Sequence, residues 1–361
     1  MPAQPVPVRI LLIGASGYIG GSILSHLRSV SNAASLRVSA LARSPSAVEA
    51  ITTSYPEVHT LLGDLGNEKL LYDAATVSDI IIYAARNTQD GIKSLVAGLA
   101  ATEAGDGHDG QHGVGQRPTL FIMLSAIISL ADPKNLRLGE PPNGRSMSDV
   151  ADLDTIMALP AHHWHVAQER AFLQLVTAEG KGDITPVIMG LPFAVGNGTG
   201  PVRTRGFVHN YVDAVLCRHD RGPFMMGNGR NIWSWGSPQD LAAAVCFIVD
   251  RWKRDESRES LSGYFFVEAG QLEMGELARH AGGTIKSAQS AVDVADDEVS
   301  TSMECESLQY PQFAELMPEL PGLWGVSAQC RADRLRNMGW APNHMEWKPL
   351  VQDCVMARLH R

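Results

Sequence analysis

The sequence predicts an α/β protein with a doubly wound parallel sheet and a smaller C-terminal lobe. Three observations predict this fold. An apolar strand at residues 8–13 runs into a turn with glycines three residues apart, apolar strands alternate with helical patterns through the first half, and glycine-rich segments join them. We expect one domain at residues 1–190 and a second lobe at residues 191–361, interleaved with the last elements of the first domain.

The first strand and the turn after it predict a nucleotide-binding site of the Rossmann type. Residues 8–13 are apolar except for Arg9, which indicates a strand buried on both faces, and GASGYIGG follows. The first two glycines permit a tight turn close to a pyrophosphate, the third lets the helix pack on the strand, and the amides of the helix start face the phosphates. The residues expected to bind the cofactor here are Gly14, Ser16, Gly17, Tyr18, Ile19 and Gly20.

The end of the second strand, LRVSALARS, predicts which dinucleotide binds. An NAD site usually places a carboxylate there for the ribose hydroxyls, whereas a 2′-phosphate needs a cation without an acidic neighbour. This strand ends in Ala42, Arg43 and Ser44. We therefore expect NADP(H) rather than NAD(H), with Arg43 at the 2′-phosphate; the alternative is an arginine that only faces solvent.

The next segments continue the pattern of a parallel sheet. Asp64 and Leu65 follow a third strand, and Ala84 and Ala85 end a fourth, where small residues permit close approach of a cofactor. We expect all four to contact it. Residues 101–117 are rich in glycine and polar side chains, which predicts a flexible insertion rather than a metal site built from its histidines. The fifth strand reads TLFIMLSAIIS.

Composition argues against several classes of protein. The 361 residues carry a net charge of −9 without a basic stripe, which argues against a nucleic-acid surface. The apolar run near the N-terminus soon ends in glycine, and no stretch approaches the length needed to span a bilayer. Five cysteines without a CxxC pair fit reduced thiols. We expect a cytoplasmic protein with neither a membrane nor a nucleic acid as partner.

Seven motifs, in order, carry a resemblance to a known superfamily: GASGYIG, LLGDL, IIYAA, FIMLSAIIS, MGLPFAVGNGTGP, GNGRNIWSWGSPQDLA and CRADRLRNMGWAP. Together they resemble the extended short-chain dehydrogenases/reductases, which include sugar-nucleotide epimerases, dehydratases and related reductases. The resemblance implies a nicotinamide cofactor, with Pro192 and Phe193 beside it, where relatives usually have arginine, proline and a Val-Tyr-Gly turn. It also implies a small-molecule substrate bound by the C-terminal lobe.

The expected active site departs from the pattern of this superfamily. Relatives usually carry a Ser or Thr just beyond the fifth strand and a Tyr-x-x-x-Lys on the following helix; the tyrosine acts as acid/base and the lysine holds the nicotinamide ribose. Matching the segments puts Ser125 on the strand and Ala126 at the hydroxyl position, with His165 at the tyrosine and Glu169 at the lysine. No tyrosine lies between the fifth strand and the next one, TPVIMGL.

The replacement predicts a His–Glu pair as the acid/base. His165 and Glu169 lie four residues apart on a helix and share a face, and a carboxylate beside an imidazole stabilises its protonated form. Because the helix is expected to open with the histidines of HHWHVAQERAFLQ, His163 could also reach the cleft. A metal is not expected, since His162 and His163 would point to different faces and no CxxC or HExxH is visible. The expected catalytic residues are thus His165, Glu169, Ser125 and His163.

Three functions remain open at this stage. The first is a small-molecule oxidoreductase in which the His–Glu pair replaces Tyr and Lys. The second is a dehydratase, isomerase or cyclase that acts in the same cleft without net redox. The third is a nucleotide-sensing regulator resembling the NmrA-like branch, where the catalytic dyad is commonly missing.

Two further expectations concern partners. Cations and large rings in the C-terminal half suggest a pocket for an aromatic or polyketide-like substrate, although for each residue alone a place in the core is the more frequent role. These residues are Arg203, Arg205, His209, Tyr211, Trp233 and Trp235. Relatives often dimerise through two helices, one of which is the helix expected to carry His165, so a homodimer is also expected.

Overall fold

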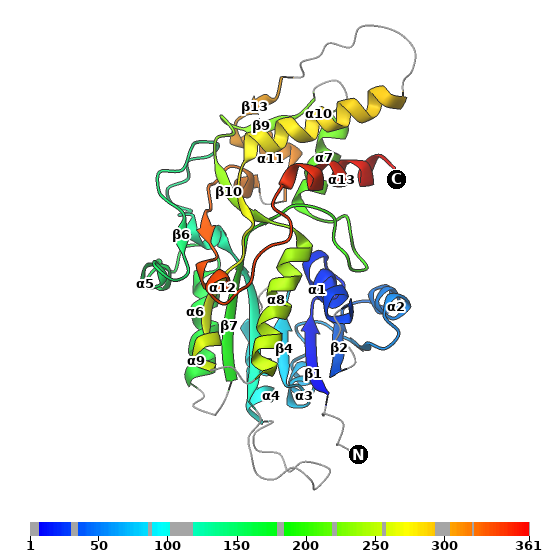
Figure 1. The fold of residues 1–361 in the computed structure, drawn as a ribbon, viewed down its shortest axis with the longest axis vertical. Coiled ribbons are helices and arrows are strands. Elements are labelled where there is room, and N and C mark those ends of the chain that lie inside the picture. The colour runs from blue at the N-terminus through cyan, green and yellow to red at the C-terminus, as the bar shows by residue number, and fades with distance from the viewer. Residues whose placement is uncertain are drawn as a thin grey trace.

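The computed structural model describes residues 7–29, 35–85, 89–101, 118–178, 184–218, 222–254, 258–292, 304–319 and 321–360. A large sheet occupies the lower part of the molecule in Figure 1, and smaller sheets with their helices lie above it.

The large sheet has seven parallel strands in the order β11-β7-β5-β4-β1-β2-β3. These strands are β1 (Val8–Ile13), β2 (Leu36–Ala42), β3 (His59–Leu62), β4 (Ile80–Tyr83), β5 (Thr119–Ala126), β7 (Ile184–Leu191) and β11 (Gly263–Phe266). The chain winds outward from β1 in both directions, so the strand order reverses between β1 and β4. The predicted doubly wound α/β fold is confirmed.

Helices cover both faces of this sheet (Figure 1). One face carries α1 (Tyr18–Ser29), α2 (Pro45–Ser54) and α8 (Pro238–Lys253), and the other carries α3 (Glu68–Thr76), α4 (Gln89–Ala101) and α6 (Val166–Ala178). Ile10 and Leu12 of β1 point to the first face, whereas Leu11 and Ile13 point to the second. Burial on both faces explains why the strands read as continuous apolar runs.

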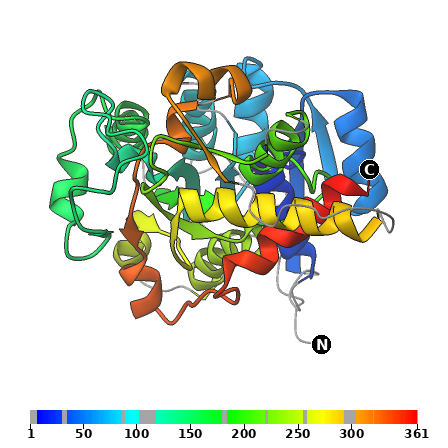
Figure 2. The ribbon, with the colours of Figure 1, turned by 90° about the horizontal axis from the view of Figure 1, so that it is seen from above.

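Most elements after β7 build the upper part of the molecule, and some of them return to the large sheet. They are described here together with the short elements that lie between β5 and β7. Three short sheets consist of β8 (Phe193–Ala194), β10 (Ile232–Gly236) and β12 (Gly270–Glu273); β9 (Phe224–Met226) and β13 (Glu306–Leu308); and β6 (Met147–Ser148) and β14 (Cys330–Arg331). The further helices are α5 (Leu153–Met157), α7 (Phe207–Leu216), α9 (Arg258–Leu261), α10 (Met274–Val292), α11 (Tyr310–Leu316), α12 (Asp333–Asn337), α13 (Trp347–Leu359) and the 3₁₀ helices η2 (Ile127–Leu130) and η4 (Pro321–Trp324). Figure 2 shows α10 and α13 side by side across the top.

The tryptophans of β10 form part of the core of this upper region. Trp233 is 2% exposed and Trp235 is 1% exposed, and Phe193 packs against both Trp233 and Trp324. His209 and Tyr211 are fully buried as well. The expectation that these four rings line a substrate pocket is therefore wrong, because they are buried in the core; Arg203 and Arg205 of the same expectation are exposed and line a cavity.

Three other sequence-based expectations can be compared with the structure. The helix expected to open at His162 begins at Val166, because residues 161–165 form turns instead. The expected insertion at residues 101–117 lies outside the described residues except for Ala101. Within the described chain, none of the helices has the length and apolar character that crossing a membrane requires.

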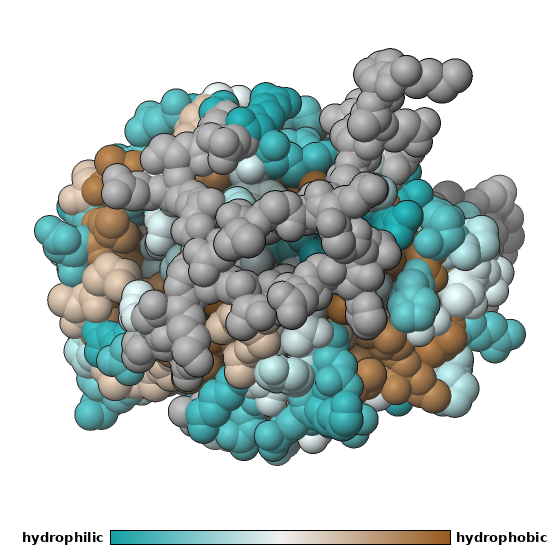
Figure 3. Space-filling view, turned by 90° about the horizontal axis from the view of Figure 1, so that it is seen from below, coloured by the Kyte–Doolittle hydropathy of each residue, from teal (hydrophilic) through white to brown (hydrophobic). Residues whose placement is uncertain are grey.

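The lower face of the molecule, where the strands of the large sheet begin, mixes hydrophilic and hydrophobic residues (Figure 3).

Candidate active site

The turn after β1 has the close backbone packing that only glycine permits. Gly14 has a φ of +88°, and a Cβ there would lie 2.4 Å from the carbonyl oxygen of Ala84 at the end of β4. A Cβ at Gly20 would lie 2.1 Å from the carbonyl oxygen of Gly14, so α1 packs directly against the turn. The start of α1 thus faces the reversal point between β1 and β4. This arrangement fits a dinucleotide pyrophosphate, with Gly17 exposed beside it.

Five other residues expected to bind the cofactor lie near the carboxyl ends of the strands. Ser16, Ile19, Ala84, Ala85 and Leu65 are each partly exposed near the ends of β1, β4 and β3. Ser16, Ile19, Ala84 and Ala85 thus stay partly accessible beside the reversal point, whereas Leu65 follows β3 at the outer edge of the sheet.

Tyr18, Pro192 and Phe193 have structural partners. The Tyr18 hydroxyl donates a hydrogen bond to the carbonyl oxygen of Gly196 (2.5 Å), which ties α1 to the loop after β8. Pro192 and Phe193 are buried, and the Phe193 ring stacks on Phe207. A cofactor contact by Phe193 would therefore come from its backbone.

Arg43 and Asp64 differ in how much of their side chain remains available. Arg43 is exposed directly after β2 and forms no hydrogen bond or ion pair with the described residues. Its neighbour Ser44 accepts a hydrogen bond from the amide of Ala47 (3.2 Å) as the N-cap of α2. Asp64 is exposed, and its carboxylate accepts a hydrogen bond from the Gly66 amide (2.9 Å). Arg43 is thus the accessible cation at the end of β2.

A buried cluster joins β5, α6 and β11. Ser125 lies on β5 with its side chain on the α6 face, and its hydroxyl donates a hydrogen bond to Oε1 of Glu169 on α6. Ser125 is 8% exposed and Glu169 is 5% exposed. The hydroxyl of Tyr264 on β11 lies beside the same carboxyl group and forms no hydrogen bond of good geometry within the described structure. The cluster therefore combines a buried carboxyl group with two hydroxyls.

Burial governs the protonation of this cluster. Removal from water raises the pKa of Glu169, while the Ser125 and Tyr264 hydroxyls partly oppose that rise. Burial also raises the pKa of Tyr264 well above its usual value, with the nearby Glu169 carboxylate adding to the effect. Tyr264 is therefore neutral, and Glu169 is a carboxyl group that takes up a proton more readily than an exposed glutamate does.

His165 stands apart from Glu169, contrary to the prediction. It precedes α6, its carbonyl oxygen accepts the hydrogen bond of the Glu169 amide (2.9 Å), and the two side chains form no hydrogen bond or ion pair. Burial lowers the pKa of His165, which is the reverse of the direction expected from a neighbouring carboxylate. The predicted His–Glu pair is wrong because the helix that would align the two side chains starts one residue after His165.

The backbone of His165 is in an unusual conformation. Among the described residues other than glycine, His165 alone has a positive φ, +66°. A non-glycine residue in this left-handed region costs about 1–3 kcal/mol and persists only where its surroundings hold it there; such residues often occur at active sites. The strain lies at the position matched to the superfamily's tyrosine.

His163 has its partners in η2 and in the segment that follows η2. It is 8% exposed, and its Nδ1 donates a hydrogen bond to the carbonyl oxygen of Ser129 in η2 (2.8 Å). Its Nε2 lies 3.9 Å from Oδ1 of Asp132. His163 was expected at the start of the helix, but it lies in the turn before α6, with its Nε2 on the side of Asp132.

Comparisons with known proteins define the fold further. No family model matches the chain. An oxidase named ucsJ from an Acremonium species is 26% identical over 351 residues, covering 92% of this chain and 92% of the relative. Among solved structures, dTDP-glucose 4,6-dehydratase from Bacillus anthracis with NAD has a TM-score of 0.66 at 11% identity, covering 98% of this chain and 97% of that chain.

A second solved structure, yeast methylglyoxal/isovaleraldehyde reductase with NADPH, has a TM-score of 0.56 at 12% identity, covering 98% of this chain and 99% of that chain. This chain thus shares the fold of a dehydratase solved with NAD and a reductase solved with NADPH, and the predicted resemblance is confirmed at the level of the fold.

Two residues in the neighbourhood of the candidate site, the buried Tyr264 and the partly exposed Asp132, were missed in the sequence. Tyr264 is separated from Glu169 by 95 positions, and no local motif marks a strand tyrosine as a partner of a helix glutamate. Asp132 follows the fifth strand closely, but its approach to His162 and His163 depends on the turn at residues 161–165, which apolar periodicity does not predict.

We predict that the free energy of unfolding of the Glu169→Gln variant, taken relative to that of the wild type, increases as the pH rises. Because burial raises the folded-state pKa of Glu169, its carboxyl group stabilises the fold fully below its unfolded pKa, and this contribution is lost as the pH rises through the folded pKa. Glutamine keeps a partner for Ser125 and cannot ionise. Urea unfolding of both proteins across pH values from about 4 to about 8 measures the difference. The exposed Glu49→Gln serves as the matched control; equal pH dependence of all three proteins would contradict the prediction.

Proposed function

We propose that this protein is an enzyme that transfers hydride between a nicotinamide cofactor and a small-molecule carbonyl or activated alkene. The observation that supports it most is the buried Ser125–Glu169 pair at the end of β5, on the same edge of the sheet as the Gly14 turn. The relative named as an oxidase and the neighbours solved with NAD or NADPH support the same class of reaction.

In this proposal the cofactor supplies or accepts the hydride, and the chain supplies the proton. The Gly14 turn and the start of α1 would hold the pyrophosphate, and Arg43 would contact the 2′-phosphate at the adenosine end of the cofactor. Glu169 would donate or accept the proton, because burial raises its pKa and so favours its protonated form over that of an exposed glutamate. Ser125 would orient the carboxyl group, and His165 would contact the reacting oxygen from the strained position before α6.

A second candidate function is proton transfer without net redox, as in a dehydratase, isomerase or cyclase. The buried carboxyl group of Glu169 favours it, since such a group suffices for acid/base chemistry in a dry cleft. The two candidates separate by absorbance, because the first consumes or forms reduced nicotinamide with every turnover and the second leaves its amount unchanged.

We predict that the protein binds NADPH more tightly than NADH and that Arg43→Ala removes the difference. Loss of a charge-assisted contact with the 2′-phosphate should weaken NADPH binding roughly tenfold to a hundredfold, and NADH binding should hardly change. Isothermal titration calorimetry with both nucleotides measures this. Arg37→Ala, an exposed arginine near the start of the same strand, is the control. Equal affinity of wild type and Arg43→Ala for NADPH would contradict the NADP preference.

We predict that Glu169→Gln and His165→Ala each slow turnover on the order of a hundredfold or more. The assay follows nicotinamide absorbance with a panel of small carbonyl compounds and activated alkenes, and product formation is measured in parallel by chromatography. His59→Ala, an exposed histidine on β3, is the control and should retain the wild-type rate. If either variant retains the wild-type rate, the role proposed for that residue is wrong.

We also propose a homodimer formed through α4 and α6. These helices pack together, and between them lies an apolar hollow lined by Ile92, Ala167, Ala171, Phe172 and Leu175, with Lys93 and Gln168 beside it. We predict that sedimentation gives the mass of a dimer for wild type and of a monomer for Ala171→Arg, because a buried unpaired charge opposes association. A wild-type monomer at high concentration would contradict this proposal.

A further inference from the structure

Three side chains of the kind that bind metal ions converge beyond the end of β5. Asp132 follows η2, and His162 and His163 lie in the turn before α6. One ligand atom from each of them lies within 4.8 Å of the other two. We propose that Asp132, His162 and His163 bind one divalent transition-metal ion of the Zn²⁺ or Fe²⁺ type.

The distances between these side chains suit a shared ion. Nε2 of His162 lies 3.1 Å from Oδ1 of Asp132, and Nε2 of His163 lies 3.9 Å from the same oxygen. Metal–ligand bonds of about 2.0–2.2 Å place two ligands of one ion roughly 3–4 Å apart. The second distance is too long for a hydrogen bond, yet it falls in the range for two atoms that bind the same metal.

The surroundings of His163 prepare it as a ligand. Its Nδ1 must carry the proton, because the partner of this nitrogen is the carbonyl oxygen of Ser129 at 2.8 Å. Nε2 of the neutral ring then keeps its lone pair and lies on the side of Asp132. Metal-bound histidines commonly have this arrangement, in which a carbonyl group fixes the tautomer and the ring orientation.

Asp132 is held in place as well. Its Oδ1 accepts a hydrogen bond from the backbone amide of Lys134 (2.9 Å), in addition to its contact with His162. The carboxylate is therefore oriented by the backbone as well as by an imidazole. A preoriented set of ligands lowers the entropic cost of capturing the ion.

The set of donors selects the kind of ion. Two imidazoles and one carboxylate suit Zn²⁺ or Fe²⁺, whereas Mg²⁺ and Ca²⁺ prefer oxygen ligands throughout. Three protein ligands leave coordination positions for water or a substrate oxygen. The side chains of His162 and Asp132 are 33% and 40% exposed, so these positions are accessible.

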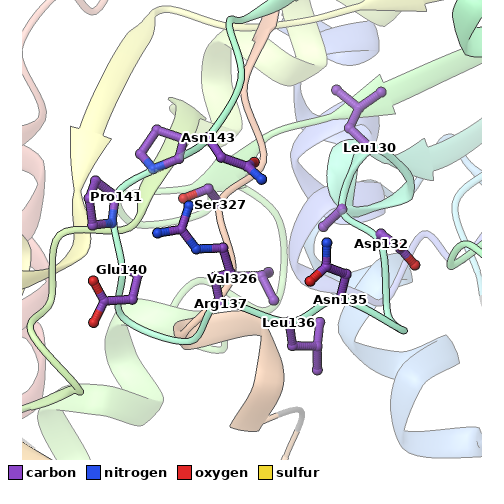
Figure 4. A pocket seen from close by; sticks show the side chains of 12 residues that line it. Leu130, Asp132, Asn135, Leu136, Arg137, Glu140, Pro141, Asn143, Val326 and Ser327 are labelled. Atoms are coloured by element: carbon purple, nitrogen blue, oxygen red, sulfur yellow. The ribbon is translucent and has the colours of Figure 1, made fainter.

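A cavity adjoins the proposed site. Asp132 stands at one side of a cavity of about 250 Å³, with Glu140 and Pro141 at the other side and Arg137 between them (Figure 4). Arg137 is exposed and its side chain forms no hydrogen bond or ion pair with the described residues. A ligand that carries an anionic oxygen could therefore contact both the metal and this guanidinium group.

The sequence-based expectation of no metal depended on a helix that included the histidines. Adjacent residues of a helix point to different faces, but His162 and His163 precede α6, and their rings lie 5.1 Å apart. The turn directs both rings toward Asp132, which lies 30 residues before His162 in the chain.

Metal binding tests the proposal directly. Full-length protein, stripped with a chelator and dialysed, is titrated by calorimetry with Zn²⁺, and Co²⁺ is added separately while its visible absorption is recorded. We expect one ion per chain and nitrogen–oxygen coordination of Co²⁺, with no comparable heat from Mg²⁺. Asp132→Asn, His162→Ala and His163→Ala should each weaken Zn²⁺ binding at least about tenfold, since each removes one ligand.

The controls separate a built site from weak binding at the surface. His59→Ala should bind Zn²⁺ as wild type does. Because His163 is buried, the test rests on His162→Ala and Asp132→Asn at partly exposed positions, and circular dichroism checks the fold of all three variants. A wild type that binds less than about half an ion per chain, or folded variants that bind as tightly as wild type, would overturn the proposal.

Discussion

The parallel direction of the seven strands brings the candidate functional groups to one edge of the large sheet. In such a sheet every strand ends on the same side, so residues far apart in sequence become neighbours without any specific attraction between them. The turn after β1, Arg43 after β2, and Ser125 near the end of β5 share this edge for that reason. A helix that follows β5 must start at the same edge, which brings Glu169 within reach of Ser125. The topology of the sheet therefore determines which residues meet in the candidate site.

Burial then determines the chemistry of the groups at this edge. A carboxyl group removed from water requires hydrogen-bond partners or a proton, and Glu169 has Ser125 as partner and a raised pKa. His165 pays a further cost in backbone strain at the position matched to the superfamily's tyrosine. Costs of this kind are common where a site is arranged for function, because a sequence optimised for stability alone would avoid them.

Much of the fold was predictable from the sequence, because apolar runs and glycine spacing report directly on strands buried on both faces and on the turn after β1. The site was only partly predictable. Ser125 and Glu169 were found by matching segments to a superfamily, but their direct hydrogen bond was not foreseen. The predicted pairing of His165 with Glu169 failed on a helix boundary, since periodicity does not show where the first turn of α6 begins. Tyr264 and Asp132 could not be assigned, because their partners lie across tertiary contacts that no local pattern records.

The measurement that tests the central claim most directly is a crystal structure of this protein grown with NADPH. We expect the pyrophosphate at the turn of Gly14 and Gly17, and the nicotinamide end beside Ser125 and Glu169, within reach of His165. A nucleotide bound elsewhere, or bound at the glycine turn with its nicotinamide remote from Glu169, would contradict the account.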